Sequence, residues 1–233
     1  MCTTCTRRSF LLMAGASLAF ASSRADADGR VACALSGDGL KDGGSTLLSK
    51  SDDPAFDNAL IAELRRILRI IPINPGFKYV SDNNAYATDT TIVAGTSGTV
   101  LIGLKLVREL LKPSQGGVAV ACVLAHECGH IFQFFSSEKY FDRLDGATQR
   151  YRELHADFLA GYYLAKRMGA ATAQMREVEK ALIDFGDYHA GNPKDHGTPG
   201  QRLAALDKGY VLSLGGAEFK DAAAEGEKYV KVL

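Results

Sequence analysis

The feature that most constrains the fold is an apolar stretch that runs directly into ionisable side chains. Residues 116 to 124 carry no charge and consist of small and aliphatic residues. His126, Glu127 and His130 follow at once, still among apolar neighbours. Ionisable groups are rare in so apolar a segment unless they are paired or bound to a metal. The stretch therefore predicts a buried helix over 117–135 that carries a polar site.

The spacing of His126 and His130 is that of two metal ligands on one helix. A helix advances about 100° per residue, so both imidazoles project from one face, one turn apart. They can therefore reach a single tetrahedral zinc ion. Glu127 points about 100° away from His126, which places it to act on a water as a general base and not as a ligand. The chain has only five histidines, so a chance match to His-Glu-x-x-His is a poor explanation.

A zinc ion needs a third protein ligand, and a catalytic site leaves the fourth position open. The segment ELHADFLAG (153–161) places Glu153 and Asp157 on one helical face that is otherwise lined by small residues, so another helix can approach it closely. We assign Glu153 as the third ligand. Asp157 would accept the free ring N–H of His126 or His130. The alternative for this segment is a solvated charged face.

Short β-prone runs precede the motif and helical patterns follow it. Asp53 and Pro54 provide an N-cap and a first-turn proline for a helix that should end before Pro72. Strands are expected in FKYV (77–80), TTIVAG (90–95) and GTVLIG (98–103). Helices are expected over 104–111, 117–135, 147–168, 171–185 and 199–209, with Tyr140 and Phe141 extending the second of them. This order of elements indicates an α+β domain.

The first residues resemble an export signal. Arg7 and Arg8 precede an apolar run from 10 to 20, which is much shorter than the roughly 20 residues of a membrane span. The paired arginines resemble the twin-arginine type of signal, and the alternative is an ordinary secretory signal. We expect a signal peptide over 1–27, a flexible leader over 28–52 and one domain over 53–233. The mature chain should be periplasmic or extracellular, without a stable membrane span.

The cysteines do not form a disulfide framework. Cys122 and Cys128 lie about 9 Å apart along one expected helix, so they cannot bridge each other and should be packed thiols. Cys122 lies one turn before His126, and the alternative is that it approaches the metal. His155 projects from another side of its helix than Glu153 and should not bind the same ion. His189 is expected in a loop.

These motifs resemble the zinc peptidases related to HtpX and the CAAX prenyl proteases. The specific part is His126-Glu127-Cys128-Gly129-His130 together with Glu153-x-x-Ala156-Asp157. Weaker similarities are NAYAT (84–88), GTVLIGLKLVREL (98–110) and DHGTPGQRLAAL (195–206), so the resemblance covers roughly residues 55 to 206. It implies a zincin-like metallopeptidase domain with short strands before the active-site helix and a helical second half.

The resemblance also implies a reaction, namely hydrolysis of peptide bonds by a zinc-activated water. One zinc ion per chain would be bound by His126, His130 and Glu153, with Glu127 as general base. His196 and Arg202 would donate to the developing oxyanion. The alternative is that His196 caps a helix and Arg202 forms a structural ion pair. In this chain Gly197 follows His196, where the family pattern has proline.

The expected partner is a peptide or protein substrate. If GTVLIG is an exposed edge strand, an extended peptide could pair with it, and the alternative is an internal strand. A net charge of zero and the lack of a basic stripe argue against nucleic acid. The competing function is a zinc-stabilised binding or assembly factor with weak or latent peptidase activity. A third is another metal-dependent hydrolase on the same scaffold.

Overall fold

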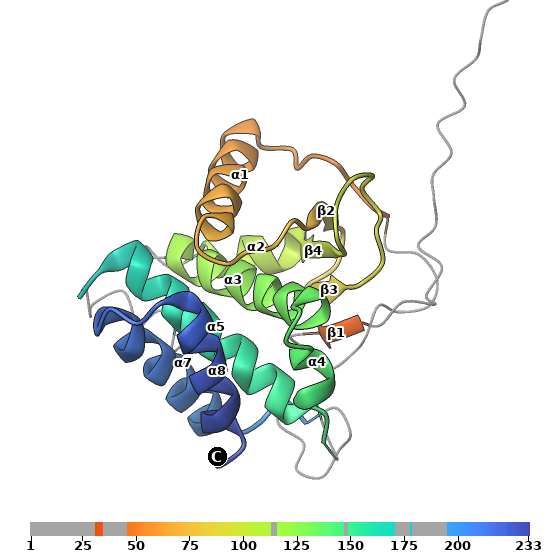
Figure 1. Cartoon of the computed structure of the whole chain (residues 1–233). Coiled ribbons are helices and arrows are strands. Elements are labelled where there is room, and N and C mark those ends of the chain that lie inside the picture. Colours follow the sequence, from red (N-terminus) through yellow and green to blue (C-terminus); the bar gives the residue numbers. More distant parts are fainter. Residues whose placement is uncertain (1–30, 35–45, 113–115, 147–148, 171–177, 179–194) are drawn as a thin grey trace, which may run out of the picture.

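The computed structural model describes residues 31–34, 46–112, 116–146, 149–170, 178 and 195–233 (Figure 1). These residues form an α+β structure, as the sequence predicts. Its elements are β1 (Val31–Ala34), α1 (Pro54–Leu68), β2 (Gly76–Val80), β3 (Ala85–Thr88), β4 (Thr99–Gly103), α2 (Leu104–Leu110), α3 (Gly116–Phe135), α4 (Tyr140–Arg143), α5 (Arg150–Met168), α7 (Pro199–Leu214) and α8 (Phe219–Val230). The expected signal peptide, His189 and the helix over 171–185, except residue 178, lie outside the described residues.

Helix α1 begins as the sequence predicts. The Asp53 side chain accepts hydrogen bonds from the backbone N–H groups of Ala55 and Phe56, and proline occupies the first turn. These bonds satisfy donors that a helix N-terminus leaves unpaired. The helix buries Leu60 and Ile67 and ends at Leu68. The expected boundary before Pro72 is therefore confirmed.

The four strands form one sheet in the order β1-β3-β4-β2. Strand β4 pairs antiparallel with β3 and parallel with β2, and all five of its residues are buried. GTVLIG is thus an internal strand, and the expectation that it is an edge open to a peptide is wrong. Its continuous run of aliphatic residues suits a strand that is covered on both faces.

The strand expected in TTIVAG is also wrong, because residues 90–95 form a loop. The Thr99 hydroxyl accepts a hydrogen bond from the Ile92 N–H at 3.1 Å and donates one to the Thr90 carbonyl at 2.8 Å. These side-chain bonds take the place of ladder bonds, and Gly95 has a positive φ of 80°. The strand at this place in the sheet is β3, which lies within the NAYAT segment.

The expected flexible leader contributes to the sheet at two places. Strand β1 pairs antiparallel with β3, with a register shift between Ala32 and Ala34. Leu48 forms an isolated bridge with Tyr79 of β2. At these positions the expectation of a loose segment is wrong. The edge strands of the sheet have unpaired backbone N–H and C=O groups, and residues that precede the domain expected over 53–233 form hydrogen bonds with them.

Helix α3 lies between the sheet and the helices of the second half (Figure 1). Residues 117–135 are long and apolar enough to cross a membrane by length and composition alone, yet 89% of this window is buried inside the protein. The helix ends at Phe135, so the expected extension through Tyr140 is wrong. Lys139 adopts a left-handed conformation with φ 53°, and α4 begins after it as a separate short helix.

The second half packs closely on α3, as its small residues predict. A Cβ atom on Gly129 would lie 3.2 Å from the Cα atom of Ala156, so α3 and α5 nearly touch at the segment from His126 to His130. A Cβ atom on Gly161 would lie only 1.9 Å from the Leu206 carbonyl oxygen, so α7 approaches α5 even more closely. Helix α7 extends beyond the expected 199–209, and α8 was not expected. These contacts fix α5 and α7 around the polar site.

Candidate metal centre

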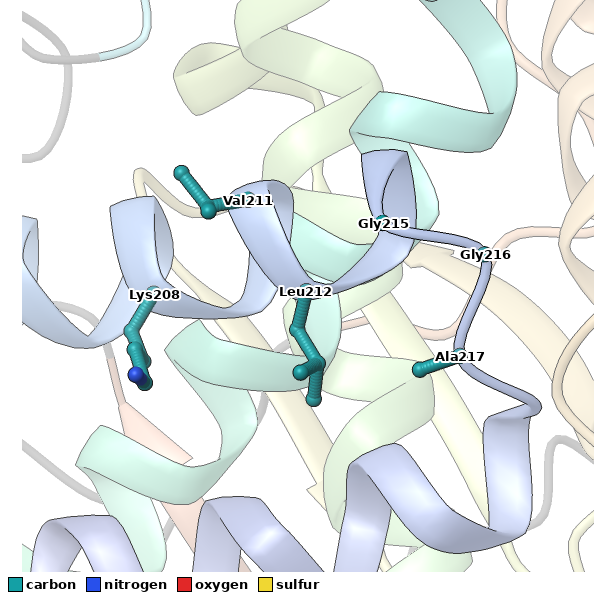
Figure 2. A pocket seen from close by; sticks show the side chains of 6 residues that line it. All are labelled: Lys208, Val211, Leu212, Gly215, Gly216 and Ala217. Carbon is teal, nitrogen blue, oxygen red and sulfur yellow. The ribbon is translucent and has the colours of Figure 1, made fainter.

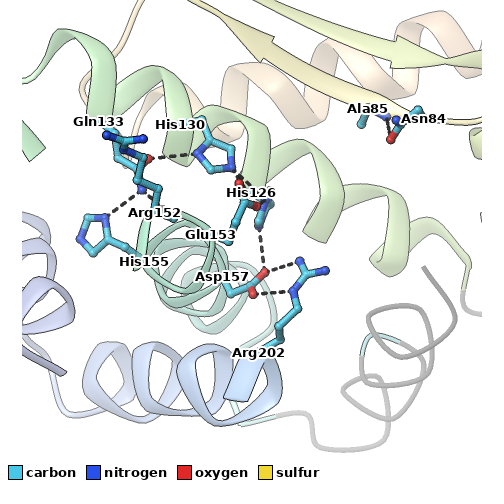
Figure 3. A network of polar contacts seen from close by, with 10 residues as sticks. All are labelled: Asn84, Ala85, His126, His130, Gln133, Arg152, Glu153, His155, Asp157 and Arg202. Atoms are coloured by element: carbon cyan, nitrogen blue, oxygen red, sulfur yellow. Dashed lines mark hydrogen bonds and ion pairs between the residues drawn. The ribbon is translucent and has the colours of Figure 1, made fainter. Parts of the chain in front are cut away.

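Three buried side chains from two helices meet at one point, as the sequence predicts (Figure 3). His126 and His130 come from α3, and Glu153 comes from α5. The two Nε2 atoms are 3.1 Å apart, and Glu153 Oε2 lies 3.3 Å from His126 Nε2 and 3.4 Å from His130 Nε2. Each of these residues is at most 2% exposed. The group could hold a metal ion.

The distances between the ligand atoms suit a small tetrahedral ion. Nitrogen and oxygen ligands at about 2.0–2.1 Å from a tetrahedral centre lie about 3.3–3.4 Å from one another. The three observed distances are within about 0.3 Å of that edge. Both carboxylate oxygens of Glu153 are buried without a hydrogen-bond partner, so the group is not already satisfied by the described part of the protein.

The surroundings of the two imidazoles also favour a positive charge between them. Asp157 Oδ1 lies 2.8 Å from His126 Nδ1, so this nitrogen donates and leaves Nε2 of a neutral ring as an acceptor. Burial lowers the pKa of His126, but the carboxylates of Asp157, Glu153 and Glu127 outweigh it and raise that pKa to about 10. The site therefore binds positive charge strongly, as a proton or as a metal ion.

Asp157 is itself fixed by Arg202. The guanidinium donates through Nε to one carboxylate oxygen and through Nη2 to the other, both at 2.8 Å (Figure 3). Burial raises the pKa of Asp157, but Arg202 and then His126 lower it below its ordinary value. Asp157 therefore stays an acceptor, and His126 is the histidine that it orients. The alternative of a solvated charged face is wrong, since Glu153 and Asp157 are both buried.

Arg202 and His196 differ in how they meet the expectations. Arg202 forms the buried ion pair that we considered as its structural alternative. His196 does not cap α7, because Thr198 is the N-cap and forms a capping box with Gln201. His196 is 2% exposed, and its Nδ1 has no hydrogen-bond partner in the described structure. Burial lowers the pKa of His196, and the charge of Glu153 opposes this shift.

Glu127 is fully buried, and neither of its carboxylate oxygens has a hydrogen-bond partner among the described residues. Burial raises the pKa of Glu127 well above its ordinary value, and Glu153 adds to this while His126 opposes it. Strongly perturbed carboxyls of this kind are common at functional sites, which makes Glu127 a candidate for one.

The sequence missed two residues that contact the site. Gln133 Oε1 lies 3.0 Å from His130 Nδ1, and Gln133 Nε2 lies 3.2 Å from His155 Nδ1 (Figure 3). Gln133 follows His130 by three positions, so it shares a helical face with that ligand. This spacing could have identified Gln133. The pairing of His155 depends on how α3 and α5 cross, which no spacing within one helix reveals.

The two cysteines of α3 are packed thiols, as expected. Cys122 and Cys128 are free and buried, and burial raises the pKa of both thiols. Cys122 is not among the side chains whose atoms converge on the metal group. The alternative in which it approaches the metal is therefore not supported by the geometry.

A hollow on α7 lies apart from this chemistry (Figure 2). Its lining is mostly apolar and contains no histidine, cysteine or carboxylate; it consists of Lys208, Val211, Leu212, Gly215, Gly216 and Ala217. It offers neither a metal ligand nor a base. The metal group is therefore the better candidate for a functional site.

Comparison with known proteins assigns no family to the chain. No family model matches the sequence, and no curated protein or solved structure matches it.

Proposed function

We propose that this chain is a zinc-dependent endopeptidase with a zincin-like domain, related to the family that its motifs resemble. One observation carries the proposal: a buried ligand group of His126, His130 and Glu153 lies next to Glu127, a buried carboxyl with no partner in the described structure. A merely structural metal site has no use for such a group. The proposed substrate is a peptide or a protein.

The ligand group favours zinc over the other common ions. Calcium and magnesium prefer oxygen ligands, whereas two imidazoles and one carboxylate form a known catalytic zinc set. The same set of two imidazoles and one carboxylate also occurs in mononuclear iron sites, so the metal must be identified by elemental analysis. A bound zinc ion would lower the pKa of a water and polarise the scissile carbonyl.

The residues of the chain then have separate tasks. Glu127 takes the proton of the attacking water and delivers it to the leaving amine, a role for which a raised pKa is favourable. Asp157 holds His126, and Arg202 holds Asp157, so Arg202 is a positioning residue in this proposal. His196 is buried, and its Nδ1 has no partner among the described residues, so we assign it the role of donor to the oxyanion of the substrate.

Two further parts of the proposal concern where the protein acts. The paired arginines and the apolar run of the first residues support export to the periplasm or beyond. Export of a folded chain suits a protein that takes up its metal while it folds. The competing function, a zinc-stabilised binding or assembly factor, uses the same ligands but does not need Glu127.

The test compares Glu127→Gln with Glu153→Gln in the purified full chain. Glu127→Gln keeps all three ligands, so about one zinc ion per chain should remain while cleavage of a peptide library falls by about 10²- to 10⁴-fold. Glu153→Gln removes an anionic ligand and should lower zinc content and cleavage together. Elemental analysis for zinc and iron, beside the digest, measures both.

Each competing outcome has a clear meaning. An active Glu127→Gln enzyme would contradict the assigned base. Full zinc affinity in Glu153→Gln would contradict the assigned ligand. A wild-type chain that binds zinc and cleaves no peptide would favour the binding or assembly factor.

A further inference from the structure

A chain of hydrogen bonds leads from His130 to the C-terminal helix α8. Gln133 contacts His130 as described above, and Gln133 Nε2 also lies 2.8 Å from the Arg152 carbonyl oxygen. His155 contacts Gln133 through Nδ1 and lies 3.0 Å from the Ala223 carbonyl oxygen through Nε2. Figure 3 shows the part from His130 to His155. Gln133 and His155 are completely buried, so water does not compete for these bonds.

The partners at the α8 end decide the state of His155. A carbonyl oxygen only accepts, so His155 Nε2 must donate to Ala223. His155 Nδ1 faces the amide nitrogen of Gln133, which the Arg152 carbonyl fixes as a donor, so Nδ1 accepts and the ring is neutral.

The state of Gln133 follows from the same rule. Its amide nitrogen faces two acceptors, the Arg152 carbonyl and His155 Nδ1, and an amide has two N–H groups to give. Its oxygen must therefore face His130, whose Nδ1 donates to it. A neutral imidazole that donates through Nδ1 carries its lone pair on Nε2. That atom is the one that lies 3.1 Å from His126 Nε2 and 3.4 Å from Glu153 Oε2.

We propose that Gln133 and His155 are positioning residues that hold His130 in the tautomer required of a metal ligand, and that docking of α8 through the Ala223 carbonyl thereby controls how firmly the site retains its metal. The inference rests on the proposed metal site, but it does not depend on peptide cleavage. The proposed network links His130 of α3 to Ala223 of α8, which lies about 90 residues further along the chain.

The packing around His155 supports the role of α8. Tyr140 stacks on the His155 ring with centroids 5.2 Å apart and an interplanar angle of 27°. Phe219 of α8 contacts Phe132 of α3, next to Gln133, at 5.0 Å. A Cβ atom on Gly226 would lie 3.1 Å from His155 Cδ2 and 2.8 Å from Phe158 Cδ1. Helix α8 therefore rests directly on His155, and little space remains for adjustment.

The experiment uses the full chain and two readouts. Gln133→Met keeps the length of the side chain but removes the acceptor for His130, and it should lower zinc retention against a chelator by about 10- to 100-fold. Nitrogen NMR of the zinc-free protein should show that Nδ1 of His130 is no longer the exclusive site of the proton. Gln133→Glu restores an acceptor and should retain zinc better than Gln133→Met. Circular dichroism checks that each variant is folded.

A matched pair on α8 tests the distant end. Gly226→Ala pushes the helix away from His155 and should lower zinc retention, whereas Glu225→Ala alters a neighbouring side chain that is 45% exposed and should change nothing. Wild-type zinc retention and wild-type tautomer in Gln133→Met would overturn the inference, as would equal zinc loss in Gln133→Met and Gln133→Glu. A chain that binds zinc without cleaving peptides would contradict the proposed peptidase and leave this inference standing.

Discussion

The two histidines of the metal group are held by opposite means. His126 donates to Asp157, whose charge is balanced by the bidentate Arg202, so its support is an ionic arm. His130 donates to Gln133, which is backed by His155 and the Ala223 carbonyl, so its support is a neutral arm. We use these two names for the sets His126–Asp157–Arg202 and His130–Gln133–His155–Ala223.

The difference shows how one site can satisfy two requirements. A carboxylate partner raises the basicity of a ligating imidazole, and the ionic arm does this for His126. A carboxylate in the place of Gln133 would be a fourth acidic side chain beside Glu127, Glu153 and Asp157, and it would add like charge to the site. The amide of Gln133 orients His130 without that cost. We expect the ionic arm to tolerate substitution less well than the neutral arm.

The strongest way to break the ionic arm is Arg202→Met. It leaves Asp157 buried without its cation, and removing one partner of a buried ion pair typically costs about 3–5 kcal/mol. The free energy of unfolding, measured by denaturant titration, should fall by about this amount. Arg202→Met combined with Asp157→Asn removes the charge but keeps an acceptor for His126, and it should regain part of the loss. If the single variant unfolds like wild type, Arg202 is not structural.

A smaller effect is expected from Asp157→Ala, which removes the support of His126 directly. Loss of such a carboxylate typically lowers metal affinity or activity by about 10- to 100-fold. Zinc retention should be measured against a chelator, with Asp157→Asn as the control that still offers an acceptor. Unchanged zinc affinity and activity in Asp157→Ala would show that the ionic arm does not orient the ligand.

The two arms should also differ in the pH dependence of stability in protein freed of metal. The pKa of His126 is raised from 6.5 to about 10, so its contribution is present below pH 6.5 and is lost as the pH rises to about 10. The pKa of His155 is lowered from 6.5 to about 4, so its neutral form favours folding above pH 6.5 and stability is lost as the pH falls toward 4. Each slope is at most about 1.4 kcal/mol per pH unit.

Unfolding with a chelator present, followed from pH 4 to 10, separates the two contributions. Asp157→Ala should flatten the alkaline side of the profile relative to wild type, and His155→Gln should flatten the acidic side. Other carboxylates also titrate below pH 5, so the comparison is between each variant and wild type. A variant that changes the opposite side of the profile would contradict the distinction between the arms.

Local chemistry made several elements predictable. Asp53 and Pro54 define the start of α1, because their cap and first-turn roles are fulfilled within three residues. His126, His130, Glu153 and Asp157 follow from helical spacing, and Gly129 and Ala156 show that their helices can touch. The sheet was harder. The loop at 90–95 has a β-prone composition, yet Thr99 holds it by side-chain hydrogen bonds. The composition of a segment does not predict whether another strand pairs with it.

The sequence by itself determined which groups are available: two imidazoles and a carboxylate on one helix, and two carboxylates on another. It could do so because a helix fixes the direction of each side chain relative to its neighbours over a few residues. The tertiary structure decided which histidine Asp157 orients, that Arg202 pairs with it, and that β4 is internal. It also brought His155 and Ala223 to His130, because such contacts depend on how helices far apart in the chain cross, which no local spacing specifies.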